Sequence, residues 1–198
     1  MEAMSPVLNK VGQFLSIPAV RDVVIQRQSC FDLRAIMDDG KIFIANLSKG
    51  KLGEDASALF GALLITKFEL AALSRADRAV GNRRDFYLYV DEFPTLATPT
   101  FAGMFSESRK YGLNLIVAMQ YLDQVDESLR NALLENVGSL IVFRVGPESA
   151  ESLGAQLGPL ITEQDVMNLE RYRCYVRLMI DGQVSSPFSA RTLPLREP

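Results

Sequence analysis

Apolar residues along this chain fall into two patterns, short continuous runs and longer stretches at helical spacing. The continuous runs have the length of β-strands and predict strands at residues 41–47, 85–90, 113–119 and 140–145. Helical spacing predicts helices between and after them, at residues 54–74, 101–111, 128–137 and 147–157. Strands that are apolar on both faces and alternate with helices indicate a mostly parallel sheet, covered by helices on both faces. We therefore expect an α/β fold in a single domain over residues 1–198.

The two ends of the chain have a different pattern. Residues 1–30 are expected to form a helical lead-in, with a helix at 6–15 that Pro18 stops. A further turn or two of helix at 31–37 ends at the turn signal Asp38-Asp39-Gly40. Near the other end, Thr162 to Asp165 has the spacing of a capping box. Alternating residues on both sides of Asp181-Gly182 predict an antiparallel edge hairpin at 171–193.

Composition excludes several kinds of chemistry. The chain has no histidine, which excludes Ser-His-Asp and Cys-His catalysis and histidine-ligated zinc. Cys30 and Cys174 lie far apart in the sequence and are expected to be free thiols. The formal net charge of −3 provides no overall basic field for nucleic acid, so a DNA partner would need a local patch or a pore lined by several subunits. We find no continuous apolar run of the ~18–20 residues that span a bilayer.

The run at 85–90 leads directly to Asp91 and Glu92. An apolar strand that ends in two carboxylates is the Walker B pattern of ATPases. The first carboxylate holds Mg²⁺, and the second orients or deprotonates the water that attacks the γ-phosphate. The structural alternative is that the pair is a pair of acidic turn residues after a buried strand.

Other polar residues follow the neighbouring strands. Gln120 comes after the run at 113–119, where a glutamine can sense a γ-phosphate or position water, or can be an ordinary residue at a strand end. Arg109 lies at the end of a predicted helix, where the helix dipole favours a cation. Alternatively, Arg109 reaches the nucleotide of a neighbouring subunit. Arg144 is a second arginine candidate, or a strand residue that pairs with a carboxylate.

The combined pattern DFYLYVDEFPTL…ESRKYGLNLIVAMQYLDQV…LRNALLENVGSLIVFRVGPESAESLG resembles the TraG/TraD-like coupling proteins of conjugation and type IV secretion. These belong to the HerA–FtsK branch of RecA-like hexameric pumps. The resemblance covers about residues 20 to 160 and implies a RecA-like P-loop ATPase fold. It also implies roles for five residues: Asp91 as the Mg²⁺ ligand, Glu92 as the catalytic carboxylate, Gln120 as the γ-phosphate sensor, and Arg109, or secondarily Arg144, as the arginine that acts across subunits.

The resemblance further implies partners and a location. The intact protein would bind ATP and Mg²⁺, form a homo-hexameric ring and move DNA, or a DNA–protein complex, through its central pore. It would dock relaxosome or secretion-system proteins and lie at the cytoplasmic face of the inner membrane, held by a membrane segment that we do not find in this sequence.

One motif of the family is missing. The chain contains no G-x-x-x-x-G-K-[ST] sequence, so we expect an incomplete P-loop core, without tight ATP binding or ATPase activity of its own. We also expect an unpaired edge beside the strand that carries Asp91. Two other hypotheses remain at this point: a docking module that recognises a relaxosome or secretion protein without catalysis, and an unrelated α/β domain in which the acidic pair is structural.

Overall fold

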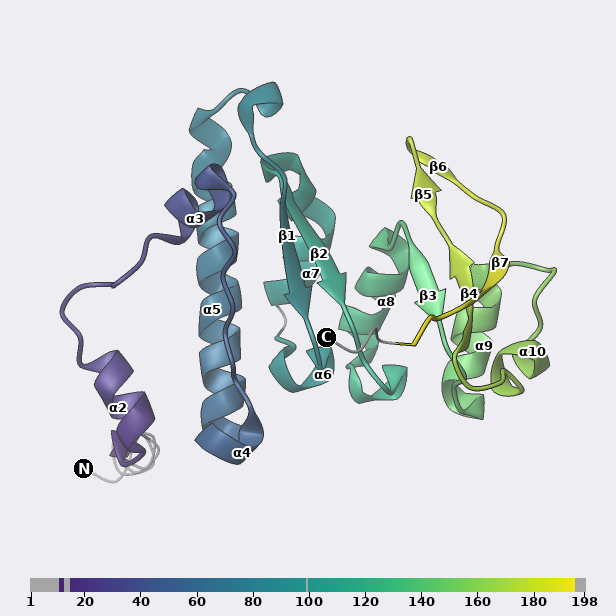
Figure 1. The fold of residues 1–198 in the computed structure, drawn as a ribbon, viewed down its shortest axis with the longest axis horizontal. Coiled ribbons are helices and arrows are strands. Elements are labelled where there is room, and N and C mark those ends of the chain that lie inside the picture. Colours follow the sequence, from purple (N-terminus) through teal and green to yellow (C-terminus); the bar gives the residue numbers. More distant parts are fainter. Residues whose placement is uncertain (1–10, 13–14, 99, 195–198) are drawn as a thin grey trace. The chain divides into compact units, whose positions relative to one another are not determined.

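The structure is a computed structural model, which describes residues 11–12, 15–98 and 100–194. These residues form two compact units that divide between Val117 and Ala118. Figure 1 labels the helices and strands of both units. The single domain predicted for residues 1–198 stays a prediction, because two compact units can belong to one domain or to two.

The first unit consists mainly of helices around a short parallel strand pair. In chain order its elements are α2 (Pro18–Val24), α3 (Leu33–Asp39), α4 (Lys49–Leu52), α5 (Glu54–Ser74), the 3₁₀ turns η2 (Arg75–Asp77) and η3 (Val80–Asn82), β1 (Phe86–Val90), α6 (Phe93–Leu96), α7 (Thr100–Glu107), the 3₁₀ turn η4 (Ser108–Tyr111) and β2 (Leu113–Val117).

Among the described residues, 11, 12 and 15 are helical and 16–17 are not, so a helix ends before Pro18, as predicted. Pro18 is the first residue of α2, a position whose backbone N–H has no partner within a helix, so that proline is accepted there. The helix predicted at 6–15 lies mostly outside the described residues. The turn at Gly40 is confirmed: α3 ends there, and Gly40 has the left-handed conformation (φ 65°) that glycine adopts without strain.

Strands β1 and β2 pair in parallel, from Phe86 opposite Leu113 to Val90 opposite Val117. Their carboxyl ends therefore meet at the same edge of the pair. Within the described residues β1 pairs with β2 alone, so the other edge of β1 is unpaired, as the sequence predicted. Such an edge presents unsatisfied N–H and C=O groups to any further strand.

The strand predicted at 41–47 is wrong as a paired strand. The segment is extended and runs alongside α5, but no strand pairing includes it (Figure 1). Phe43 packs against Phe68 of α5 with ring centroids 5.7 Å apart, whereas Ile42 and Ile44 are 91% and 86% exposed. The apolar pattern predicts an extended segment, but a strand also requires a second strand at hydrogen-bonding distance.

Helix α5 has the bounds that the sequence predicted, and it is apolar around most of its circumference. One side is buried through Ile65, Phe68 and Ala72, while Leu63 and Leu70 are about half exposed on the other. With the turn that follows, Glu54–Asp77 is long and apolar enough by average hydropathy to cross a membrane, a test that core helices of soluble proteins also pass. The continuous-run criterion overlooked this helix because charged residues interrupt it. A helix that is apolar all round is typical of one covered on every side.

The second unit packs helices against antiparallel strands. Its elements are the 3₁₀ turn η5 (Leu122–Gln124), α8 (Glu127–Asn136), β3 (Leu140–Val142), α9 (Pro147–Leu157), α10 (Glu163–Met167), β4 (Arg173–Arg177), β5 (Met179–Ile180), β6 (Gln183–Val184) and β7 (Phe188–Arg191). Its core joins η5, β3, α9 and α10 through Leu122, Val142, Leu153, Leu157, Ile161 and Val166.

The pairing of β3 corrects part of the fold prediction. β3 pairs with β4 in antiparallel orientation, and β4 pairs with β7 in the same way. The hairpin at Asp181-Gly182 is confirmed by the antiparallel pair β5–β6. The fold is therefore mixed α/β, with one parallel pair in the first unit and antiparallel pairs in the second; the described pairings do not form a mostly parallel sheet.

The capping box of α10 gives a test of the second unit. The Thr162 side chain accepts a hydrogen bond from the Asp165 backbone, and Asp165 accepts from the backbone and hydroxyl of Thr162, which lowers the pKa of the Asp165 carboxyl. We expect Thr162→Ala to lower the free energy of unfolding by about 1 kcal/mol at neutral pH. Because the pKa of Asp165 is lower in the folded state, this stabilisation is present above the unfolded pKa and is lost as the pH falls through the folded one.

The measurement is thermal unfolding of both proteins from pH 7 to pH 2. The difference between them should shrink at low pH; a difference that stays constant with pH would contradict the capping-box account.

Candidate functional site

The acidic pair Asp91–Glu92 lies between two buried anchors. Val90, the last residue of β1, is 5% exposed, and Phe93, the first residue of α6, is fully buried. The Phe93 ring packs edge-to-face on Phe101 with centroids 4.8 Å apart. Both acidic side chains are exposed at the carboxyl end of the strand, where the buried neighbours fix their backbone.

The backbone at Glu92 is unusual. Glu92 has left-handed dihedral angles (φ 51°, ψ 45°), and its N–H donates to Asp91 Oδ1 at 3.0 Å. The carbonyl oxygen of Glu92 then accepts from the Thr95 N–H at 2.9 Å, which closes the first turn of α6. A side chain other than glycine in this region costs free energy, and such residues cluster at functional sites.

A groove of about 780 Å³ adjoins the acidic pair within the first unit. Its walls come from β1, α5, α6, the extended segment at 43–48 and Lys49 of α4. Its polar lining consists of Asp91, Glu92, Thr95, Asn46, Ser48, Lys49 and Ser57. A groove of this volume, apolar along its walls with a few polar groups, has the size and character of small-molecule sites.

The acidic pair can serve a divalent cation. Among the described residues there is no group of three or more Asp, Glu or Cys side chains placed to hold a metal ion. Mg²⁺ does not require such a group, because it keeps several waters and commonly binds one or two carboxylates together with substrate phosphates. The exposed carboxylates of Asp91 and Glu92 therefore fit a nucleotide-bound Mg²⁺.

Arg109 lies at the other end of the strand pair from the acidic residues. It belongs to η4, which leads into the first residue of β2, whereas Asp91 follows the last residue of β1. The strands run parallel over five residues each, a rise of about 13 Å between their first and last residues. Within one chain, the structure thus separates Arg109 from Asp91 by the length of the strands.

The Arg109 side chain is exposed, and in the described part of the chain it has neither a hydrogen bond nor an ion pair. Gln120 and Arg144 belong to the second unit, where both are exposed: Gln120 follows Met119, which packs against that unit's core, and Arg144 comes two residues after β3. Their roles beside the acidic pair stay predictions.

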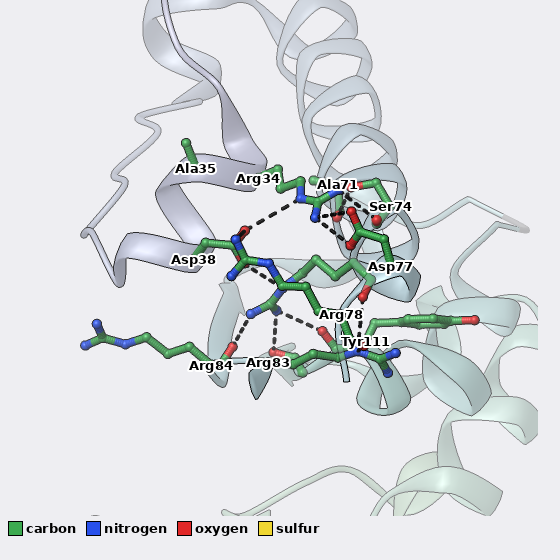
Figure 2. Close-up of polar contacts among 12 residues, drawn as sticks. Arg34, Ala35, Asp38, Ala71, Ser74, Asp77, Arg78, Arg83, Arg84 and Tyr111 are labelled. Atoms are coloured by element: carbon green, nitrogen blue, oxygen red, sulfur yellow. Dashed lines mark hydrogen bonds and ion pairs between the residues drawn. The ribbon is translucent and has the colours of Figure 1, made fainter. Parts of the chain in front are cut away.

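Sequence reasoning missed a buried polar cluster around Asp38, which Figure 2 shows. Arg75 is fully buried, and its Nε lies 3.0 Å from Asp38 Oδ1 as an ion pair without hydrogen-bond alignment. The same carboxylate lies 3.1 Å from Arg78 and 3.6 Å from Arg34. Arg75 begins a polar stretch of the sequence, residues 75–84, and the sequence offers no signal that this first residue is buried.

The left-handed backbone of Glu92 can be tested for strain by substitution. We expect Glu92→Gly to raise the free energy of unfolding of the first unit by about 0.5–1 kcal/mol, because glycine adopts positive φ without steric cost. Glu92→Gln should leave the stability nearly unchanged, since it retains the strained backbone. Chemical denaturation of the three proteins measures both effects; equal stability of the glycine and glutamine variants would contradict the strain.

The chain is similar to known proteins in sequence and in fold. Residues 85–172 match the family model described as the TraM recognition site of TraD and TraG. A search of curated proteins gave no significant match.

Among solved structures, the bacterial conjugative coupling protein TrwBdeltaN70 in its unbound monoclinic form matches with a TM-score of 0.65 at 18% identity, over 89% of this chain and 47% of that one. TrwB in complex with ADP and Mg²⁺ matches with a TM-score of 0.66 at 19% identity, over 93% and 48%. TrwB in complex with a non-hydrolysable ATP analogue matches with a TM-score of 0.64 at 20% identity, over 100% and 52%.

The chain thus spans about half the length of the structures it matches, and shares their fold. The family match begins at the first residue before β1 and includes the acidic pair, Arg109, Gln120 and Arg144. The resemblance to TraG/TraD-like coupling proteins seen in the sequence is confirmed by residues 85–172, which match the family model of the TraM recognition site of TraD and TraG.

Proposed function

We propose that this chain is part of an ATP-driven motor that moves DNA, or a DNA–protein complex, in a conjugation or type IV secretion system. The observation that carries the proposal is the exposed Asp91–Glu92 pair, held between buried residues at the carboxyl end of a parallel strand pair. Ligands of open α/β sheets bind beyond the carboxyl ends of their strands. The likeness of the fold to TrwB, which has been crystallised with ADP and Mg²⁺ and with an ATP analogue, supports a nucleotide at this end.

In this proposal each residue has one task. Asp91 holds the cation, and its second contact, the Glu92 N–H, keeps one carboxylate oxygen oriented. Glu92 orients and deprotonates the attacking water, and Gln120 contacts the γ-phosphate. A Mg²⁺ ion bound with ATP would be held by Asp91 and would stabilise the negative charge that develops on the phosphates.

Arg109 completes the site of a neighbouring subunit. Its place at the amino end of β2, a strand length from Asp91, supports action on another subunit's nucleotide rather than on the nucleotide of its own chain. A homo-hexameric ring would supply such a neighbour, with the DNA in its central pore. Arg144, which is also exposed, is the secondary candidate for this contact.

The proposal also covers the location of the protein and the parts that a complete motor requires. The ring would lie at the cytoplasmic face of the inner membrane. A complete motor also requires a phosphate-binding loop, which this chain does not contain. We use "intact protein" for this chain joined to a segment that carries that loop. The mostly parallel RecA-like sheet would form in the intact protein, where the unpaired edges of β1 and β2 can receive further strands.

We expect Glu92→Gln in the intact protein to lower DNA-stimulated ATP hydrolysis by roughly 10²–10⁴-fold, because the amide cannot accept the proton of the attacking water. Nucleotide affinity should stay within a few-fold of the unsubstituted protein, since the cation ligand Asp91 remains. Steady-state hydrolysis and nucleotide titration measure the two quantities. Glu135→Gln, on α8, removes a carboxylate elsewhere and is the matched control; equal loss in both variants would contradict the proposal.

A second candidate function is a docking module. The observation that favours it is the family match itself, whose description is the recognition site for TraM. A module of this kind would bind a relaxosome or secretion protein without using the acidic pair. It therefore predicts that Glu92→Gln leaves both partner binding and DNA transfer unchanged.

The two functions can be separated in one strain. We expect Glu92→Gln in the intact protein to retain binding of a purified TraM protein, measured by calorimetric titration, while conjugative transfer falls with the ATPase activity. Retained transfer would favour docking alone, because a motor cannot work without hydrolysis.

A further inference from the structure

The turn that carries Arg109 is held by two arginines from elsewhere in the sequence. Arg75 Nη1 donates to the carbonyl oxygens of Tyr111 at 2.8 Å and Gly112 at 3.4 Å. Arg83 donates through Nη1 to the carbonyl oxygen of Lys110, and its guanidinium lies 5.3 Å from the centre of the Tyr111 ring. The three residues that follow Arg109 thus have their carbonyl oxygens bound by guanidinium groups. We call Arg75 and Arg83 the turn clamp.

Arg75 is fixed in turn from three sides. Its Nη2 donates to the carbonyl oxygen of Arg84, two residues before β1 begins, and its Nε pairs with Asp38 of α3. Its own carbonyl oxygen accepts from Arg83 Nε at 3.1 Å, which links the two members of the clamp. A fully buried guanidinium requires this degree of pairing, because an unpaired charge in the protein interior is costly.

The clamp leaves little freedom to the backbone on either side of Arg109. Ser108, just before it, is 3% exposed, and Gly112 closes the turn with φ 71°. A Cβ atom at Gly112 would lie 3.1 Å from the Arg84 carbonyl oxygen and 3.2 Å from Arg75 Nη1, so the clamp fits glycine there. Arg109 itself stays exposed. The backbone of the turn is therefore held in place, whereas the Arg109 side chain extends into solvent.

We propose that Arg75, secured by Asp38, is a positioning residue that holds the 108–112 turn so that Arg109 projects toward the neighbouring subunit's nucleotide. This inference rests on the proposed function, because it assigns Arg75 the task of aiming Arg109. An arginine on a fixed backbone loses less conformational freedom when it meets its phosphate than one on a mobile loop.

The three carbonyl contacts of Arg75 and its ion pair with Asp38 can also serve stability alone. The structure offers a way to separate these roles, because the same acidic cluster contains an arginine that does not contact the turn. Arg34 donates hydrogen bonds to Asp77 and to the carbonyl oxygen of Ser74, and forms an ion pair with Asp38 at 3.6 Å. It thus joins α3 to the end of α5 without reaching residues 108–112. Arg34→Met is therefore the matched control for lost stability.

The test variant is Arg75→Lys in the intact protein. Lysine keeps the charge opposite Asp38 but has a single nitrogen in place of the planar fork, so it cannot bind the Arg84 and Tyr111 carbonyl oxygens together. We expect kcat for DNA-stimulated ATP hydrolysis to fall on the order of 10²-fold, with KM for ATP nearly unchanged. In an Arg109→Ala background the same substitution should cause no further loss, because there is no arginine left to position.

Hydrogen exchange supplies a readout that does not depend on catalysis. The Gly112 N–H donates to the backbone carbonyl oxygen of Arg109, and the Phe86 N–H donates to the backbone carbonyl oxygen of Gly112. The exchange rates of both amides therefore report on the stability of the turn. They should exchange faster in Arg75→Lys and at the normal rate in Arg34→Met.

The outcomes separate the two hypotheses. Faster exchange, a lower kcat and no additivity with Arg109→Ala support the positioning role. An equal fall of kcat in Arg34→Met at equal loss of melting temperature, or full additivity with Arg109→Ala, overturns it. If Arg109→Ala retains full activity, the role given to Arg109 under the proposed function fails, and unchanged exchange in Arg75→Lys would independently overturn the clamp.

Discussion

The burial of Arg75 is the constraint on which the first unit depends. A guanidinium without solvent must find its partners within the protein, and Arg75 finds them in Asp38 of α3, in the Arg84 carbonyl before β1 and in the Tyr111 carbonyl before β2. Parallel strands are not joined by a tight turn, so their relative register must be set by other contacts. Here the Phe86 N–H donates a hydrogen bond to the Gly112 carbonyl oxygen, next to the contacts of Arg75 and at the start of the pairing between β1 and β2. These contacts fix the amino ends of both strands. The strands then pair as far as Val90 and Val117, and Asp91 follows directly after β1.

The two ends of this strand pair divide the proposed chemistry. The carboxyl end presents two exposed carboxylates, one of them on a left-handed residue that lies between the buried Val90 and Phe93. The amino end presents Arg109 on a clamped turn. A single chain cannot bring the two together across the length of the strands. In the proposed ring of identical subunits, each interface would join the amino end of one strand pair to the carboxyl end of the next.

The sequence predicted what depends on local chemistry. The bounds of α5, the glycine end of α3, the capping box at Thr162 and the hairpin at Asp181 all follow from local sequence preferences, and all are confirmed. The strand predictions failed where they depended on a partner strand. The segment at 41–47 pairs with no strand among the described residues, and β3 pairs with β4 in antiparallel orientation. The positions of Asp91 and Glu92 at a strand end were predictable, whereas the left-handed backbone of Glu92 and the burial of Arg75 depend on contacts distant in sequence.

The most direct test of the account is complementation between two inactive subunits. Rings of the intact protein that mix Glu92→Gln subunits with Arg109→Ala subunits contain some interfaces in which an unsubstituted Glu92 faces an unsubstituted Arg109 from the next subunit. If the two residues serve one site from different subunits, the mixture regains part of the DNA-stimulated ATPase activity that each variant lacks alone. A mixture as inactive as either variant would contradict the shared site.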